Sequence, residues 1–203
     1  MYHFSIPMAL MDFVPVLCFG YAAALLQRDL YDKMRKSHFA LFAAGTIHIF
    51  AAGFLKALWK LLYAANICDF HALNTMFLPV QSMGFLLAGL GIVLMMTSRK
   101  KVMLAVPPPV FSGSAIFIVM MVLGLGSICT VMSIIAVKMK KKCAMLLFIA
   151  SFLCSMGMGA MSGQDASLAW VNWVEQSINC VGQGLLMWGV IILDRAGLNE
   201  YKL

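Results

Sequence analysis

Two short polar motifs recur at matching places in the two halves of this hydrophobic chain. Lys-Met-Arg-Lys at 33–36 recurs as Lys-Met-Lys-Lys at 138–141, and Gln-Ser at 81–82 recurs at 176–177. Each motif falls at the same point of its half, before the second or near the start of the third apolar run. We interpret the chain as two related halves. The alternative is two chance matches in an apolar chain of low complexity.

The composition predicts a membrane protein. The chain has 203 residues, of which 63% are hydrophobic and 11% charged, with a mean hydropathy of +0.92, whereas about a quarter of the residues of a soluble domain are charged. A run of about 20 apolar residues crosses the hydrocarbon core as a helix. We therefore predict an all-α polytopic membrane protein, a single transmembrane domain over 1–203, with six spans at about 7–27, 39–62, 77–98, 111–137, 144–162 and 173–193.

Three spans per half predict an inverted repeat. With an odd number of spans in the first half, the second half enters the membrane upside down, which is a recurring plan of channels and secondary transporters. This 3+3 inverted-topology repeat would comprise about 7–98 and 111–195, joined by an interfacial proline-rich connection at about 99–110. We expect about ten extra residues in the first half around 59–74, where an asymmetric feature could provide specificity.

The basic residues predict contact with lipid and argue against nucleic acid. The net charge is +7, but the basic residues lie in short turns, where they set topology and contact anionic headgroups. Counted for an inverted repeat, seven fall on one side and six on the other. The basic cluster follows the first span, so we expect both termini outside a plasma (cytoplasmic) membrane.

Amide side chains form a stripe along the sixth span. Their spacings of four, three and four place them on one helical face, and Gln81 in the third span is the repeat counterpart of one of them. Amides donate and accept hydrogen bonds, so the stripe could replace water around a polar solute. The alternative is hydrogen bonding that only holds helices together. The predicted path comprises Gln81, Asn172, Gln176, Asn179 and Gln183.

Four titratable residues within or near the spans are candidates for charge recognition or proton coupling. Glu175 and Asp12 lie near the starts of their helices, where a solvated carboxylate is the alternative interpretation. Lys56 could extend to the interface or pair with Asp12. His48 lies in mid-span and could relay protons or simply bond to another helix.

No cofactor, metal site or catalytic residue is predicted. Cys68 and His71 form a single Cys-x-x-His pair, half of a structural zinc site. Most of the six cysteines fall inside spans, where free cysteine behaves as a small hydrophobe. We therefore expect that the chain is not an enzyme.

Three functions remain open. The first is a transporter or channel for a small polar solute or ion, with its path along the sixth and third spans. The second is the substrate-binding membrane subunit of a larger uptake complex, because the chain is similar in length, span number and basic, alanine- and glycine-rich character to bacterial vitamin-uptake subunits; a homodimer is an alternative assembly. The third is a membrane thiol-redox or hydrolytic enzyme, for which Cys18 and Cys129 are the candidate thiols.

Overall fold

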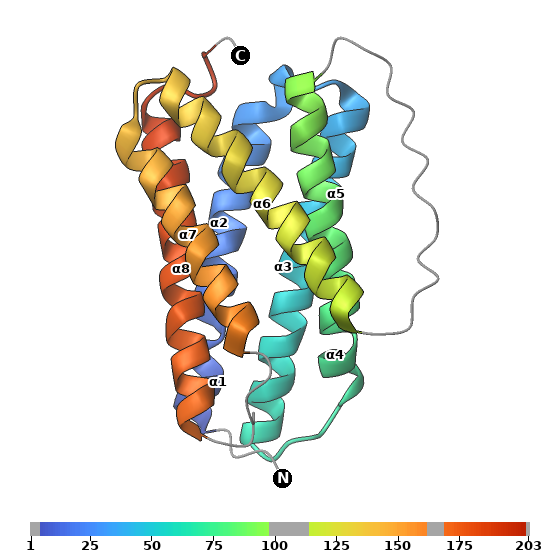
Figure 1. Cartoon of the computed structure of the whole chain (residues 1–203). Helices are drawn as coiled ribbons and strands as arrows, with labels where there is room; N and C mark the ends of the chain where they lie inside the picture. The colour runs from blue at the N-terminus through green and yellow to red at the C-terminus, as the bar shows by residue number, and fades with distance from the viewer. Residues whose placement is uncertain (1–4, 98–113, 162–168, 202–203) are drawn as a thin grey trace.

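A computed structural model of the chain describes residues 5–97, 114–161 and 169–201, and over these residues the protein is helical, with no strand. This confirms the predicted all-α class for the described part of the chain (Figure 1). The elements are α1 (Ile6–Met11), α2 (Phe13–Leu30), the short 3-10 helix η1 (Tyr31–Lys33), α3 (Lys36–Ala64), α4 (Ala72–Thr75), α5 (Phe77–Thr97), α6 (Ser114–Lys138), α7 (Lys142–Met161) and α8 (Ala169–Arg195).

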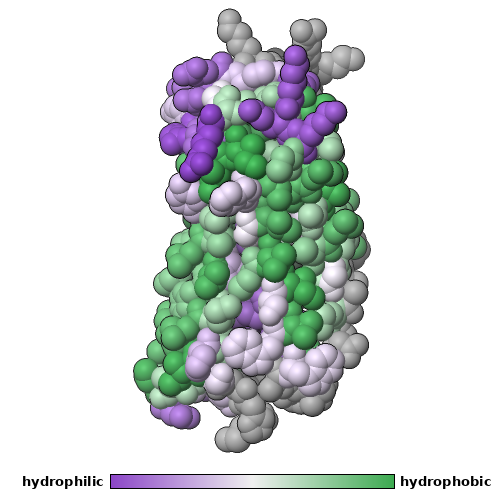
Figure 2. Space-filling view, turned by 90° about the vertical axis from the view of Figure 1, so that its left-hand side faces the viewer, coloured by the Kyte–Doolittle hydropathy of each residue, from purple (hydrophilic) through white to green (hydrophobic). Residues whose placement is uncertain are grey.

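Six helical segments are long and apolar enough to cross a membrane, as predicted. Large apolar side chains face outward along them, which is the surface that lipid requires. Figure 2 shows this largely hydrophobic belt beneath a crowded hydrophilic end. The six apolar helices indicate an integral membrane protein, and they are Ile6–Lys33, Lys36–Ala64, Ala72–Thr97, Ile116–Lys138, Lys142–Gly159 and Trp170–Arg195.

The two halves run in the same direction, so the predicted inverted arrangement is wrong. In Figure 1, α2, α5, α6 and α8 point one way and α3 and α7 the other. Contacts agree with this: Gln176 near the start of α8 contacts Met11 just before α2, and Asp194 at the end of α8 contacts Arg28 at the end of α2. The inverted prediction assumed that 99–110 joins helix ends on one side of the bundle. Instead, α5 ends and α6 begins at opposite ends, and 99–110 itself lies outside the described residues.

The six long helices pack as a ring with matching contacts in the two halves. The ring runs from α2 through α3, α5, α6, α7 and α8 back to α2. Helix α2 packs on α3 and α8, and its counterpart α6 packs on α7 and α5. Likewise α3 packs on α5 as α7 packs on α8. The contacts are therefore those expected of two like-oriented halves turned about the axis of the bundle.

One end of the bundle is basic and tightly packed. All described lysines and arginines except Lys56 and Lys60 lie at this end, in the turns and helix ends around 28–36, 138–142 and 195. The apolar core fills the same half of the bundle, with fully buried side chains from every long helix of the ring, including Leu30, Phe42 and Ile135. Ser5 and Tyr201 lie at opposite ends of the bundle, so the expectation that both termini share one side is also wrong.

Candidate functional site

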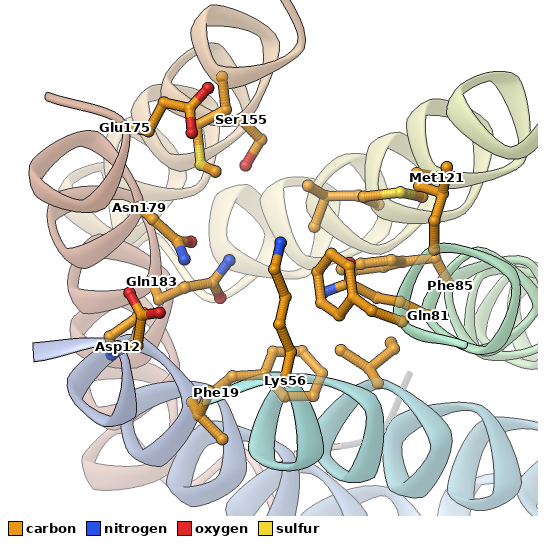
Figure 3. Close-up of a pocket in the computed structure, with 18 of the residues that line it drawn as sticks. Asp12, Phe19, Lys56, Gln81, Phe85, Met121, Ser155, Glu175, Asn179 and Gln183 are labelled. Carbon is orange, nitrogen blue, oxygen red and sulfur yellow. The ribbon is translucent and has the colours of Figure 1, made fainter. Parts of the chain in front are cut away.

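A partly open cavity of about 330 Å³ lies at the end of the bundle opposite the basic residues. It is lined by the starts of α2, α5, α6 and α8 and by the ends of α3 and α7. All of the predicted site residues except His48 line it, although they come from four separate parts of the chain (Figure 3). They are Asp12, Lys56, Gln81, Asn172, Glu175, Gln176, Asn179 and Gln183.

Proline in the first span explains the role of Gln176. Pro15 has no N–H, so the carbonyl of Met11, four residues earlier, receives no helical hydrogen bond from it. The Gln176 side chain, 7% exposed, donates from Nε2 to this carbonyl oxygen at 2.9 Å and so ties α8 to the first span. The contact of Gln176 is therefore of the kind that the alternative interpretation described, a hydrogen bond that holds two helices together.

A nearly buried ion pair forms part of the cavity wall. Lys60 Nζ lies 2.6 Å from Asp12 Oδ2, and the two side chains are 13% and 8% exposed. The sequence suggested Lys56 as the partner of Asp12. Lys60, one turn further along α3, takes that place.

Lys56 points its ammonium into the cavity (Figure 3). Its Nζ lies 3.9 Å from the centre of the Phe77 ring, a cation–π contact. No described carboxylate lies within 4 Å of this ammonium. Lys56 and Lys60 both lie toward the end of α3, at the cavity end of the bundle. The prediction of extra residues around 59–74 stays a prediction, because residues 162–168 of the second half lie outside the described part of the chain.

Three buried oxygen atoms in the cavity wall have no hydrogen-bond donor among the described residues. They are Oδ1 of Asp12, Oε1 of Gln81 and Oε1 of Gln183. A buried acceptor without a partner costs about 1–3 kcal/mol. Such atoms next to a cavity indicate a place where water or a polar solute donates hydrogen bonds.

Apart from Ser155, the rest of the cavity wall is apolar, and His48, the remaining predicted site residue, lies elsewhere. Phe19, Phe85 and Met121 face the cavity. His48 is exposed on the outer face of α3, with Nδ1 2.6 Å from the carbonyl oxygen of Ala44 in its own helix. At 100° per residue, the helix makes two full turns and about 80° more between positions 48 and 56. This rotation separates His48 from the cavity face.

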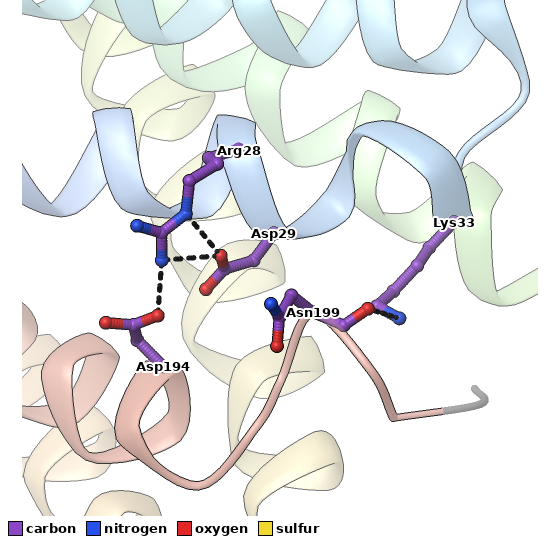
Figure 4. A network of polar contacts seen from close by, with 5 residues as sticks. All are labelled: Arg28, Asp29, Lys33, Asp194 and Asn199. Atoms are coloured by element: carbon purple, nitrogen blue, oxygen red, sulfur yellow. Dashed lines mark hydrogen bonds and ion pairs between the residues drawn. The ribbon is translucent and has the colours of Figure 1, made fainter.

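Arg28 and Lys33 make polar contacts with the C-terminal part of the chain at the basic end, and the sequence did not predict them. We call these contacts the polar latch. Arg28 bonds Asp29 through Nε at 2.9 Å and also contacts Asp194 at the end of α8. Lys33 donates to the backbone carbonyl oxygens of Asn199 at 2.9 Å and Tyr201 at 2.6 Å (Figure 4). The signal available in the sequence was the Arg-Asp and Asp-Arg pairs at the ends of the first and sixth spans.

The described residues contain no group of three or more His, Cys, Asp or Glu side chains that could hold a metal ion. All six cysteines are free thiols. Comparison with known proteins gives no match, either to a protein-family model, to a curated protein or to a solved structure. The case for a function therefore depends on the geometry of the cavity.

Proposed function

We propose that this chain is a membrane transporter for a small polar solute, with the cavity as its binding site. The observation that supports this most is the convergence of charged and amide side chains, with three unpaired oxygens, on one cavity inside an apolar bundle. Polar groups at membrane depth are costly, so they are typical of solute and ion paths. Packing alone does not require acceptors without donors.

The arrangement of the halves gives further support. Repeats of like orientation, related by an axis along the membrane normal, are a second plan of secondary transporters beside the inverted one. In this proposal the recurring motifs mark equivalent positions: both basic motifs lie at one end, and Gln81 and Gln176 both lie near the cavity. The proposal replaces the inverted repeat and keeps the transport function.

The closed basic end fits one state of an alternating-access cycle. The apolar core, the contact of Arg28 with Asp194 at the end of α8, and the contact of Lys33 with the backbone after α8 separate the cavity from the basic end. Basic residues favour the cytoplasmic side of a plasma membrane. The cavity would then be reached from outside, and release of the latch would be part of inward opening.

Filling the cavity tests the proposal. Cells that express the chain are given a mixture of isotope-labelled small metabolites, and uptake is measured by mass spectrometry. We expect at least one solute to enter faster than in vector-only cells. We expect Asn179→Trp to reduce this uptake to the vector level, because the indole occupies the space into which Asn179 projects. His48→Trp, on the lipid-facing side of α3, should keep at least about half of the uptake.

The outcomes separate the candidate functions. Equal uptake by wild type and a folded Asn179→Trp variant would rule out the cavity as the solute path. Binding of a solute by the purified chain without transport in liposomes would instead identify a binding subunit that needs a partner for uptake.

A further inference from the structure

The charges around the cavity define what a ligand must supply. Asp12 and Lys60 satisfy one another at 2.6 Å. Lys56 remains as a cation with an aromatic contact. The carboxylate of Glu175 also lines the cavity, but no described carboxylate lies within 4 Å of the Lys56 ammonium. Because this ammonium points into the cavity, an anionic group of the ligand is its natural partner.

The unpaired oxygens require a hydrogen-bond donor, and a positively charged donor suits the carboxylate among them. Asp12 is 7% exposed and carries its unpartnered Oδ1 on the cavity wall, where Gln81 and Gln183 add one unpartnered oxygen each. All three atoms accept hydrogen bonds, and one belongs to a carboxylate. A ligand ammonium, with three N–H donors and a positive charge, satisfies such acceptors.

We propose that the cavity binds a compact zwitterion of the α-amino-acid class. The ligand carboxylate contacts Lys56, and its ammonium donates to Asp12 Oδ1 and to an unpartnered amide oxygen of the wall. A neutral polyol leaves Lys56 without an anion, a simple anion leaves the oxygens without donors, and a simple cation faces Lys56. This inference rests on the proposed function, because it assigns a ligand class to the same site.

The remaining walls favour an apolar side chain on that zwitterion. Phe19, Phe77, Phe85 and Met121 line the cavity beside the polar groups. The volume of about 330 Å³ lies at the lower end of the range of about 300–1,000 Å³ for small-molecule pockets. Leucine is therefore a suitable first probe, since it adds a branched apolar side chain to the two charges.

Matched analogues test each charge separately. Leucine, leucinamide and 4-methylpentanoate are titrated calorimetrically into the full chain in detergent. Leucinamide lacks the carboxylate and 4-methylpentanoate lacks the ammonium, so each should bind about 10- to 100-fold more weakly than leucine, the effect of losing one charged hydrogen bond. In Lys56→Gln the difference between leucine and leucinamide should disappear, while His48→Gln should retain it.

Two results would overturn the assignment. One is no binding by leucine or by any of the twenty common amino acids tested singly, and the other is equal binding of all three probes. If labelled-metabolite uptake still responds to Asn179→Trp in either case, the site is a solute path and only the zwitterion assignment fails. If uptake does not respond, the proposed function fails as well.

Discussion

Replacing Asp12 by leucine is expected to lower the free energy of unfolding by about 3–5 kcal/mol, the usual cost of removing one partner from a buried ion pair. The Asp12 and Lys60 side chains are 8% and 13% exposed, so the substitution leaves the nearly buried Lys60 without this carboxylate. Unfolding in detergent micelles, followed by circular dichroism against increasing denaturant, measures the change.

The double variant separates the ion pair from the general effect of a new side chain. Asp12→Leu combined with Lys60→Met removes both charges and should recover most of the lost stability, because two apolar side chains often replace a buried pair at little cost. A single variant as stable as wild type, or a double variant no more stable than the single one, would contradict this description of the pair.

Gly124→Leu is expected to destabilise the protein by about 3 kcal/mol or more, at the upper end of the effects of overpacking. A Cβ atom at Gly124 would lie 2.2 Å from the backbone carbonyl carbon and oxygen of Phe85, which cannot move aside as a flexible side chain would. This contact joins α6 to α5, and so one half of the ring to the other. The same measurement of unfolding applies.

Gly157→Leu is the matched control. A Cβ atom there meets nothing within 4 Å, although Gly157 also lies in a long helix of the second half. Its stability should stay within about 0.5 kcal/mol of wild type, as for substitutions away from packed features. Equal losses in the two variants would show that the α5–α6 contact is not as close as described.

The spans and the cavity residues could be predicted because each depends on local periodicity. Runs of apolar residues fix the six spans, and spacings of four, three and four place Asn172, Gln176, Asn179 and Gln183 on one face of α8. The structure brings that face to the same cavity as Asp12. Charged and amide residues had few other places to lie inside an apolar bundle.

The direction of the second half could not be predicted in the same way. The inverted prediction counted three spans per half and assumed that each connection begins and ends on the same side of the membrane. Nothing in the local pattern around 99–110 indicates otherwise. The partners of individual groups also depend on tertiary contacts. Gln176 bonds a carbonyl freed by Pro15, and Asp12 pairs with Lys60 and not with Lys56, one turn earlier in α3.

The central claim is that the halves share one orientation, and two native cysteines test it directly. Cys68 is exposed between α3 and α4 at the cavity end, and Cys143 is exposed at the start of α7 at the basic end. Two variants are made, each keeping one of these cysteines and replacing the other five by serine or alanine. Each is treated in intact cells with a membrane-impermeant maleimide. Parallel halves with the basic end inside predict labelling of Cys68 in intact cells and of Cys143 only after permeabilisation. An inverted repeat places both on one side, so labelling of both cysteines from the same side would contradict the account.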